Sequence, residues 1–184
     1  MNKVILTAYV SMIDEEKKEA LCCIDQIKQP LCCKLQPEHI KSIKAGDTVT
    51  FQAELHSRDI TMRNPCNCNT VDNRVESYLV VSRIFHSAGY CNEATLDPVV
   101  SVQEGKLICV SGKTFQTVRV RLPENAGYAT VTIPDKKIIP VGTILSVCGV
   151  IKVKEYKKHL VCPCCKQEYI SPQLSLLVRG YLIK

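Results

Sequence analysis

The chain carries cysteines in an arrangement that could hold a metal ion. Twelve cysteines occur among its 184 residues, and two groups of them are closely spaced. The first is the Cys-x-Cys pair Cys66 and Cys68, and the second is the run CPCC with Cys162, Cys164 and Cys165. Structural zinc takes four cysteine or histidine ligands in a tetrahedron, and neither group supplies four cysteines. A site therefore requires the two groups to meet, His159 to join the second group, or another subunit to contribute.

We predict that the two groups meet around zinc. The predicted ligands are Cys66, Cys68, Cys162 and Cys164, with Cys165 or His159 as substitutes. The spacing differs from that of a CxxC…CxxC ribbon, so simple loop thiols are the alternative interpretation. The other cysteine pairs lie in ALCCIDQI and PLCCKL, which read as a hairpin that sets Cys22 opposite Cys33. One facing pair of this hairpin is expected in the core, because unpaired cysteine behaves as a small hydrophobe.

Basic and aromatic residues gather in the second half of the chain. The segment KVKEYKKHL and the residues after it carry seven candidates: Lys152, Lys154, Tyr156, Lys157, Lys158, Lys166 and Tyr169. The first half offers Tyr9, Arg58 and Arg63, with Arg83 as a weaker candidate. Cations beside phosphates and flat rings beneath bases are what sequence-tolerant binding of single-stranded nucleic acid requires. The alternative is a solvated hairpin that binds nothing.

An internal repeat explains why both sets of residues occur twice. Gly46 and Gly142 are 96 residues apart, and each is followed at matching distances by an apolar alternation, a basic residue and a Cys-x-Cys. Arg58 and Lys154 fall at the same offset from these glycines. We therefore expect two domains, residues 1–90 and residues 98–184, joined by a connector at residues 86–98. Domains of about 90 residues are large enough to fold independently.

Each half is predicted to contain five strands with a short helix before the fourth. In the first half these are KVILTAYVSMI, ALCCIDQI, PLCCKL, the helix QPEHIKSIKAG, a strand through residues 49–55, and VESYLVVSRIF. In the second half they are EGKLICVSG, TFQTVRVRL, YATVTI, the short PDKKIIPVG, TILSVCGVIKVK and LSLLVRGYLI. Alternating apolar positions are typical of half-buried strands. The predicted fold is all-β, with two tandem five-stranded oligonucleotide/oligosaccharide-binding (OB) barrels.

Two stretches bring a family resemblance. MNKVILTAYV resembles the opening strand of bacterial single-stranded DNA-binding proteins (SSB), and residues 46–58 resemble their glycine, alternating strand and basic residue. The likeness reaches the second half only through the internal repeat. The chain departs from the family by ending in the strand LLVRGYLIK instead of an acidic tail, and by having no Trp and three Phe. The resemblance therefore implies a specialised relative, from a plasmid, phage or other mobile element.

Composition limits the other classes of function. The longest apolar runs are far short of a membrane span, and the first residues lack the features of a signal peptide, so we expect a cytoplasmic protein with reduced thiols and no membrane partner. There is no phosphate-binding glycine loop, HExxH or GxSxG motif, so no enzyme activity is predicted. Residues 1–92 hold eleven basic and eleven acidic residues, whereas residues 93–184 hold thirteen and seven. The excess positive charge favours a polyanionic partner.

These observations predict a protein that binds single-stranded DNA with little sequence preference, in DNA replication or transfer. The sequence leaves open two rivals, an OB-fold adaptor of a replication or conjugation assembly and an RNA-binding protein. It also leaves open partner proteins of such an assembly and a homo-oligomer.

Overall fold

Strands make up nearly all of the regular structure. The computed structural model describes residues 1–24, 30–64, 66, 68, 70–86, 89–134 and 137–182, without the side chains of residues 110, 154–158, 171–177 and 182. Its elements are β1 (Asn2–Asp14), β2 (Glu19–Cys23), β3 (Leu31–Lys34), α1 (Pro37–Ile40), β4 (Thr48–Arg63), β5 (Val71–Phe85), β6 (Asn92–Ser101), β7 (Lys106–Val110), β8 (Lys113–Arg121), the 3₁₀ helix η1 (Pro123–Asn125), β9 (Tyr128–Ile133), β10 (Ile144–Val161) and β11 (Glu168–Leu182). The prediction of an all-β chain is confirmed. No helix in the described part of the chain is long and apolar enough to cross a membrane.

The first five strands close a circuit of pairings. β1 pairs with β2, β2 with β3, β3 in parallel with β5, β5 with β4, and β4 with β1. The element order is the one predicted for this half, with α1 between β3 and β4. Alternate residues of β1 and β4 are buried inside the circuit: Val4, Leu6, Ala8 and Val10 from one strand, and Val49, Phe51, Ala53 and Leu55 from the other. The apolar alternation of each strand therefore marks the core face.

The second half closes an equivalent circuit with a different first strand. β6 pairs with β8, β8 with β9, β9 in parallel with β11, β11 with β10, and β10 with β6. The predicted connector at residues 86–98 is wrong, because β6 begins at Asn92 inside it. The predicted first strand, EGKLICVSG, is instead β7, which forms a hairpin with β8 at the end of the sheet. The described residues between β9 and β10 contain no helix, so the helix predicted there is not observed, and η1 lies one connection earlier.

Matching backbone contacts relate the two circuits. Gly46 and Gly142 both have positive φ, +101° and +85°, and each N–H donates to a carbonyl of its circuit's first strand, at Val10 and Ser101 respectively. Positive φ favours glycine, because a Cβ crowds the backbone in that region. The two glycines of the sequence repeat therefore occupy equivalent turns before β4 and β10.

Two asparagines that sequence reasoning missed strengthen this match. The Asn2 side chain donates to the Leu55 carbonyl (2.7 Å) and accepts from the Leu55 N–H (3.1 Å). Asn92 makes the same pair of bonds to Ile151, at 3.0 and 2.8 Å. Leu55 and Ile151 lie at the same distance after their glycines. An Asn that binds the fourth strand of its circuit is thus a second repeated feature.

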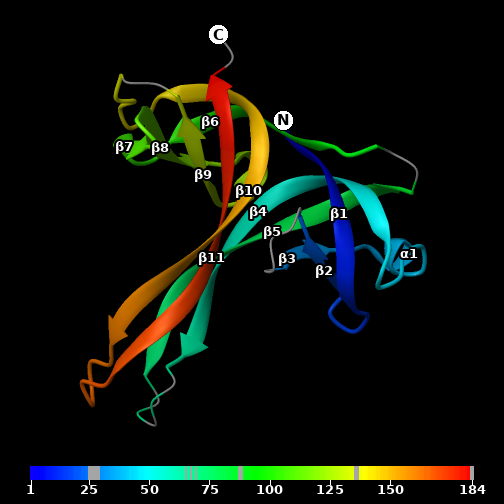
Figure 1. Cartoon of the computed structure of the whole chain (residues 1–184), viewed down its shortest axis with the longest axis horizontal. Coiled ribbons are helices and arrows are strands. Elements are labelled where there is room, and N and C mark those ends of the chain that lie inside the picture. Colours follow the sequence, from blue (N-terminus) through cyan, green and yellow to red (C-terminus); the bar gives the residue numbers. More distant parts are fainter. Residues whose placement is uncertain are drawn as a thin grey trace.

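β1 and β6 also join the circuits to each other. They are antiparallel, with Val4 opposite Ala94, Asn2 opposite Leu96 and Leu6 opposite Asn92. The pairing is therefore symmetric about Val4 and Ala94. In the order of strands in the sheet, β1 and β6 are neighbours, and the remaining strands of the two circuits follow on either side of this pair (Figure 1).

The β2–β3 hairpin has a different register from the predicted one. Cys22 lies opposite Leu31, and Cys33 opposite Ala20. A register change of two residues keeps every side chain on its face, so the apolar pattern alone could not distinguish the two. Cys22 and Cys33 are still fully buried, which confirms that one pair of thiols belongs to the core.

Candidate metal centre and nucleic-acid interface

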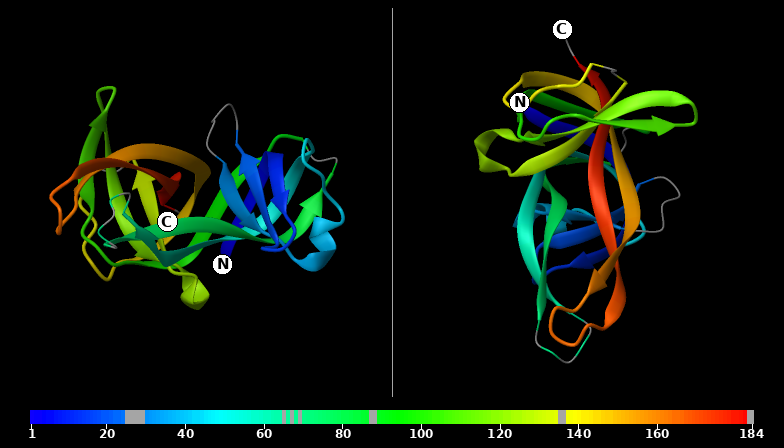
Figure 2. Two further views of the ribbon diagram at one scale, coloured as in Figure 1. Left: turned by 90° about the horizontal axis from the view of Figure 1, so that it is seen from below. Right: turned by 90° about the vertical axis from the view of Figure 1, so that its left-hand side faces the viewer.

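Two long hairpins extend from the circuits and meet at their tips. β4 pairs with β5 as far as Arg63 and Val71, and β10 pairs with β11 as far as Val161 and Glu168. Both views of Figure 2 and the view of Figure 1 show the hairpins beside each other, with the far ends of β4 and β5 next to those of β10 and β11. The repeat thus brings the two cysteine groups to one place.

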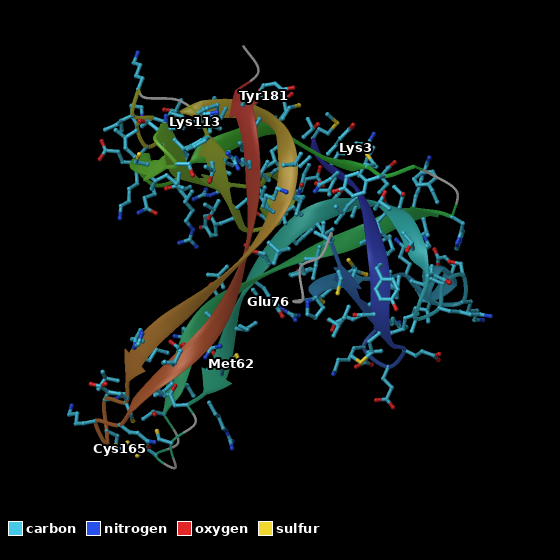
Figure 3. The ribbon with its side chains drawn as sticks, viewed as in Figure 1. Lys3, Met62, Glu76, Lys113, Cys165 and Tyr181 are labelled. Carbon is cyan, nitrogen blue, oxygen red and sulfur yellow. The ribbon has the colours of Figure 1, made fainter. Side chains whose placement is uncertain are left out.

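Four thiols form a cluster where the tips meet. The Sγ atoms of Cys66, Cys68, Cys162 and Cys165 all lie within 4.8 Å of one another. Those of Cys66 and Cys162 are 3.3 Å apart. In a tetrahedral zinc site with Zn–S bonds of about 2.3 Å, the sulfur atoms are separated by about 3.8 Å. The four thiols could therefore hold a metal ion after small side-chain movements. Figure 3 marks the position of Cys165 at the joined tips.

Three of the four clustered cysteines are those predicted from the sequence, and the fourth is different. Cys66, Cys68 and Cys162 come together as predicted, but Cys165 completes the set of four, and Cys164, whose thiol contacts Cys68, is not part of it. Both residues lie in the tight turn of the second tip, in which the Lys166 N–H donates to the Cys162 carbonyl (3.0 Å). His159, the other substitute, is an exposed residue within β10 and is not part of the cluster among the described residues.

Hydrogen bonds connect the cluster to both hairpins. Thr70 Oγ1 accepts from Asn64 Nδ2 (2.7 Å), which leaves its hydroxyl proton for Cys162 Sγ at 3.3 Å. The Tyr169 hydroxyl of β11 donates to Asn64 Oδ1 across the junction. Asn64 is 9% exposed and Cys162 is fully buried. Hydrogen-bonded groups of this kind orient the ligands of metal sites, and their removal typically weakens metal binding.

The same contacts alter the acidity of the thiols. Hydrogen bonds from Thr70 and from the backbone N–H groups of Cys165 and Cys164 lower the pKa of Cys162 to about 6. Hydrogen bonds with the Cys165 and Cys164 thiols raise the pKa of Cys68 well above its usual value. The thiolate is the form that binds metal, so Cys162 is prepared for coordination at neutral pH.

The predicted nucleic-acid residues are spread over the hairpins and β1. Tyr9 is 49% exposed on β1, and Arg63 and Lys152 are exposed on β4 and β10. Tyr169 is half-buried in the contact between the tips. The side chains of Lys154, Tyr156, Lys157 and Lys158 lie outside the described part, although their backbone pairs in the β10–β11 ladder. Their roles in binding remain predictions.

Arg58 and its repeat partner Lys154 have different neighbours. The Arg58 guanidinium forms an ion pair with Glu76 (Nη2–Oε2 2.6 Å), the residue opposite it on β5. Lys154 occupies the equivalent position in the second hairpin, and the residue opposite it is Ser175. A carboxylate therefore competes with phosphate for the cation in the first hairpin, whereas the opposite strand provides none at this position in the second.

Aromatic rings beside cations form two clusters that sequence reasoning missed. On the outer face of β3, β4 and β5, Lys34 Nζ lies 4.5 Å from the Tyr78 ring centre, and His56 stacks on the same ring at 5.7 Å. In the second circuit Arg119 lies 4.7 Å from the Tyr128 ring centre, and Arg179 lies 4.9 Å from that of Phe115. Tyr78 is the outward neighbour of buried Leu79, and the β4–β5 register sets it opposite His56. The sequence could have indicated the contact between His56 and Tyr78 if the register of the β4–β5 hairpin had been predicted.

Comparison with known proteins shows the fold. No protein-family model and no curated protein matches the chain. It is similar to the solved structure of wild-type single-stranded DNA-binding protein from Thermus aquaticus, with a TM-score of 0.60 and 11% identity over 98% of this chain and 90% of that chain. A deletion variant of the same protein matches with a TM-score of 0.59 and 11% identity over 98% and 91%. The chain therefore has an SSB-like fold.

Proposed function

We propose that the chain binds single-stranded DNA with little sequence preference, in the replication or transfer of DNA of a mobile element. The observation that carries this proposal is the fold likeness, which extends over nearly the full length of both chains and joins this protein to one that is named for binding single-stranded DNA. Because that solved structure is of a binding protein, we propose binding without catalysis.

The binding surface is proposed to consist of two tandem OB-fold units. The first is residues 1–90, and the second runs from β6 to the C-terminus of the chain. Support comes from the two closed strand circuits and from the matched contacts of Asn2 and Asn92. OB barrels commonly bind single strands through cationic grooves and aromatic platforms. The clusters around Tyr78 and Tyr128 supply such a combination on each unit.

The β10–β11 hairpin is proposed as the main contact with phosphates. All of the excess positive charge lies in residues 93–184, and Lys152, Lys154, Lys157 and Lys158 follow one another along β10. The first hairpin contributes Arg63, and Arg58 contributes less because of its bond to Glu76. Tyr9, Tyr156 and Tyr169 remain the proposed aromatic contacts from the sequence.

A fluorescence-anisotropy titration with labelled oligo-dT, duplex DNA and RNA of equal length tests the proposed function. We expect tightest binding to oligo-dT and weaker binding to the duplex, because the faces of the bases are accessible to aromatic side chains only in a single strand. Affinity should fall as salt increases, because bound phosphates release counterions. Tighter binding to RNA than to oligo-dT would indicate that the ligand is RNA and not DNA. Failure to bind any of the three at low salt would favour the adaptor function.

Zinc is the metal proposed for the four-thiol cluster. Thiolates suit soft or borderline metals, and four of them in a tetrahedron are a usual set for structural zinc. Elemental analysis of protein purified without added metal should find one zinc per chain, with Cys66, Cys68, Cys162 and Cys165 protected from thiol reagents. Protein that contains no metal and has all four thiols freely reactive would contradict the proposal.

A further inference from the structure

The described side chains of the β4–β5 hairpin form no core of their own between the circuit and the tip. In residues 58–63 of β4 and 71–76 of β5, every side chain is exposed or half-buried. An isolated two-stranded hairpin is only marginally stable in water. The positions of these segments therefore depend on contacts with the rest of the chain, at their two ends and between β5 and β11.

One end is attached to the opposite circuit. The Ser57 N–H donates to the Ala126 carbonyl (2.8 Å), and the Tyr128 N–H donates to Ser57 Oγ (2.7 Å). Ala126 and Tyr128 flank Gly127, whose positive φ and close approach to Ser57 leave no room for a Cβ. The base of the first hairpin is thus fixed to the second half of the chain.

The other end of the β4–β5 hairpin is the four-thiol cluster. Its buried groups are thiols and polar side chains instead of an apolar core. Cys162 is fully buried and Asn64 is 9% exposed, and the groups nearest to them are thiols, Thr70 and Tyr169. Buried polar groups contribute no hydrophobic stabilisation, and a buried thiol contributes only as a small hydrophobe. A metal bound by four thiolates from two hairpins would supply the missing stabilisation, because such binding is coupled to folding.

We propose that metal at this cluster joins the two hairpins into one arm, so that the proposed phosphate contacts of both hairpins bind the same strand, and that metal loss separates the hairpins while the β1–β6 pairing keeps the two circuits together. This inference rests on the proposed function and adds its regulation. Binding surfaces in a fixed arrangement gain avidity over either alone, provided that the ligand reaches both, and metal loss removes this fixed arrangement for the two hairpin surfaces. Metal loss should therefore weaken binding of a strand that spans both halves, and should leave binding of a strand that fits one half nearly unchanged.

The experiment compares the full chain with zinc and after removal of zinc by a chelator that is then dialysed away. Its probes are oligo-dT of about 8 and about 35 nucleotides, chosen because one OB fold covers about 4–16 nucleotides. We expect metal removal to weaken binding of the longer probe at least 10-fold and binding of the shorter probe less than 2-fold, with recovery after zinc is returned. An equal loss for both probes, or no loss for the longer one, would overturn the inference.

Hydrogen exchange provides a readout that needs no DNA. Amides of residues 58–63 and 71–76 should exchange at least 10-fold faster without zinc, while those of the buried strand residues Leu6 and Phe51 should not change. Unchanged exchange in this β4–β5 hairpin would overturn the inference even if the protein binds DNA. Faster exchange in a protein that binds neither probe would instead contradict the proposed function and leave the metal-dependent joining of the hairpins supported.

Asn64 and Tyr169 act as positioning residues in this junction. Tyr169→Phe removes the hydroxyl that binds Asn64 Oδ1 and retains the ring. We expect this variant to retain zinc with about 10-fold lower affinity in a chelator competition, since loss of such outer contacts typically costs 10–100-fold. Tyr181→Phe is the matched control, because Tyr181 is exposed on the same strand far from the tip. Equal zinc affinity for both variants would remove Tyr169 from the proposal.

Discussion

Cys162→Ser is expected to remove zinc and to lower the melting temperature of the full chain by about 6–12 °C. Cys162 is the fully buried thiol of the cluster, and serine is a poor ligand for zinc in its place. Loss of a structural zinc costs several kcal/mol of folding free energy. If the zinc site contributes about 3 kcal/mol to the free energy of unfolding, the stated decrease in melting temperature follows for a chain of this size. Differential scanning calorimetry and elemental analysis measure the two effects.

Cys164→Ser is the matched control for this prediction. It changes a neighbouring thiol in the same tip that contacts Cys68 but is exposed and is not one of the four clustered thiols. The variant should keep its zinc and should melt within about 1 °C of the unchanged protein, as is usual for a surface substitution. A Cys164→Ser protein that loses zinc while Cys165→Ser retains it would restore the ligand set predicted from the sequence and contradict the geometry of the tip.

Replacing Lys152, Lys154 and Lys157 together with alanine should flatten the salt dependence of oligo-dT binding by up to about 2 units of slope. Each phosphate contact on a single strand contributes about −0.7 to the slope of log K against log salt. The loss of affinity at 50 mM salt should then exceed that at 200 mM by about 16-fold. Anisotropy titrations over this range measure the slope. Tyr156→Ala should instead weaken binding at an almost unchanged slope, because stacking releases no counterions.

A control variant that loses the same amount of charge elsewhere distinguishes the effect of the β10–β11 hairpin from the effect of net charge. Lys41, Lys44 and Lys106 are exposed and belong to other parts of the fold. Their joint replacement with alanine should change the slope by less than about half a unit if the β10–β11 hairpin is the main contact. Equal effects of both triple variants would indicate that binding depends on net charge and would contradict the proposed location.

The internal repeat was sufficient to predict where the two cysteine groups meet. Equal spacing from Gly46 and Gly142 to the cysteines implies equal hairpin lengths, and equal hairpins from two related units can end at one point. The apolar alternation also identified the core faces of β1, β4 and β10, because each of these strands has one buried side. These predictions depended on patterns within single strands and on one repeat.

The sequence-based predictions were wrong where the structure depends on which strands pair with each other and in which register. Nothing in the alternation of β7 distinguishes a strand inside the circuit from one in a projecting hairpin, and β6 contains Pro98, which weakens its strand signal. The β2–β3 register could not be chosen, since a change of two residues preserves both faces. The choice of Cys165 over Cys164 required the geometry of a turn that closes at Lys166. Cross-strand partners such as Glu76 for Arg58 likewise required a register.

The symmetric pairing of β1 with β6 has a consequence for the behaviour of the protein at low concentration. Asn2 faces Leu96 and Leu6 faces Asn92, so each half presents the same edge to the other, as two identical subunits would. In a dimer of separate chains, this interface would be lost on dilution according to mass action. Within one polypeptide the partner is always present at a local concentration set by the short connection between β5 and β6. The pair of halves is therefore maintained even when only a few molecules are present in a cell.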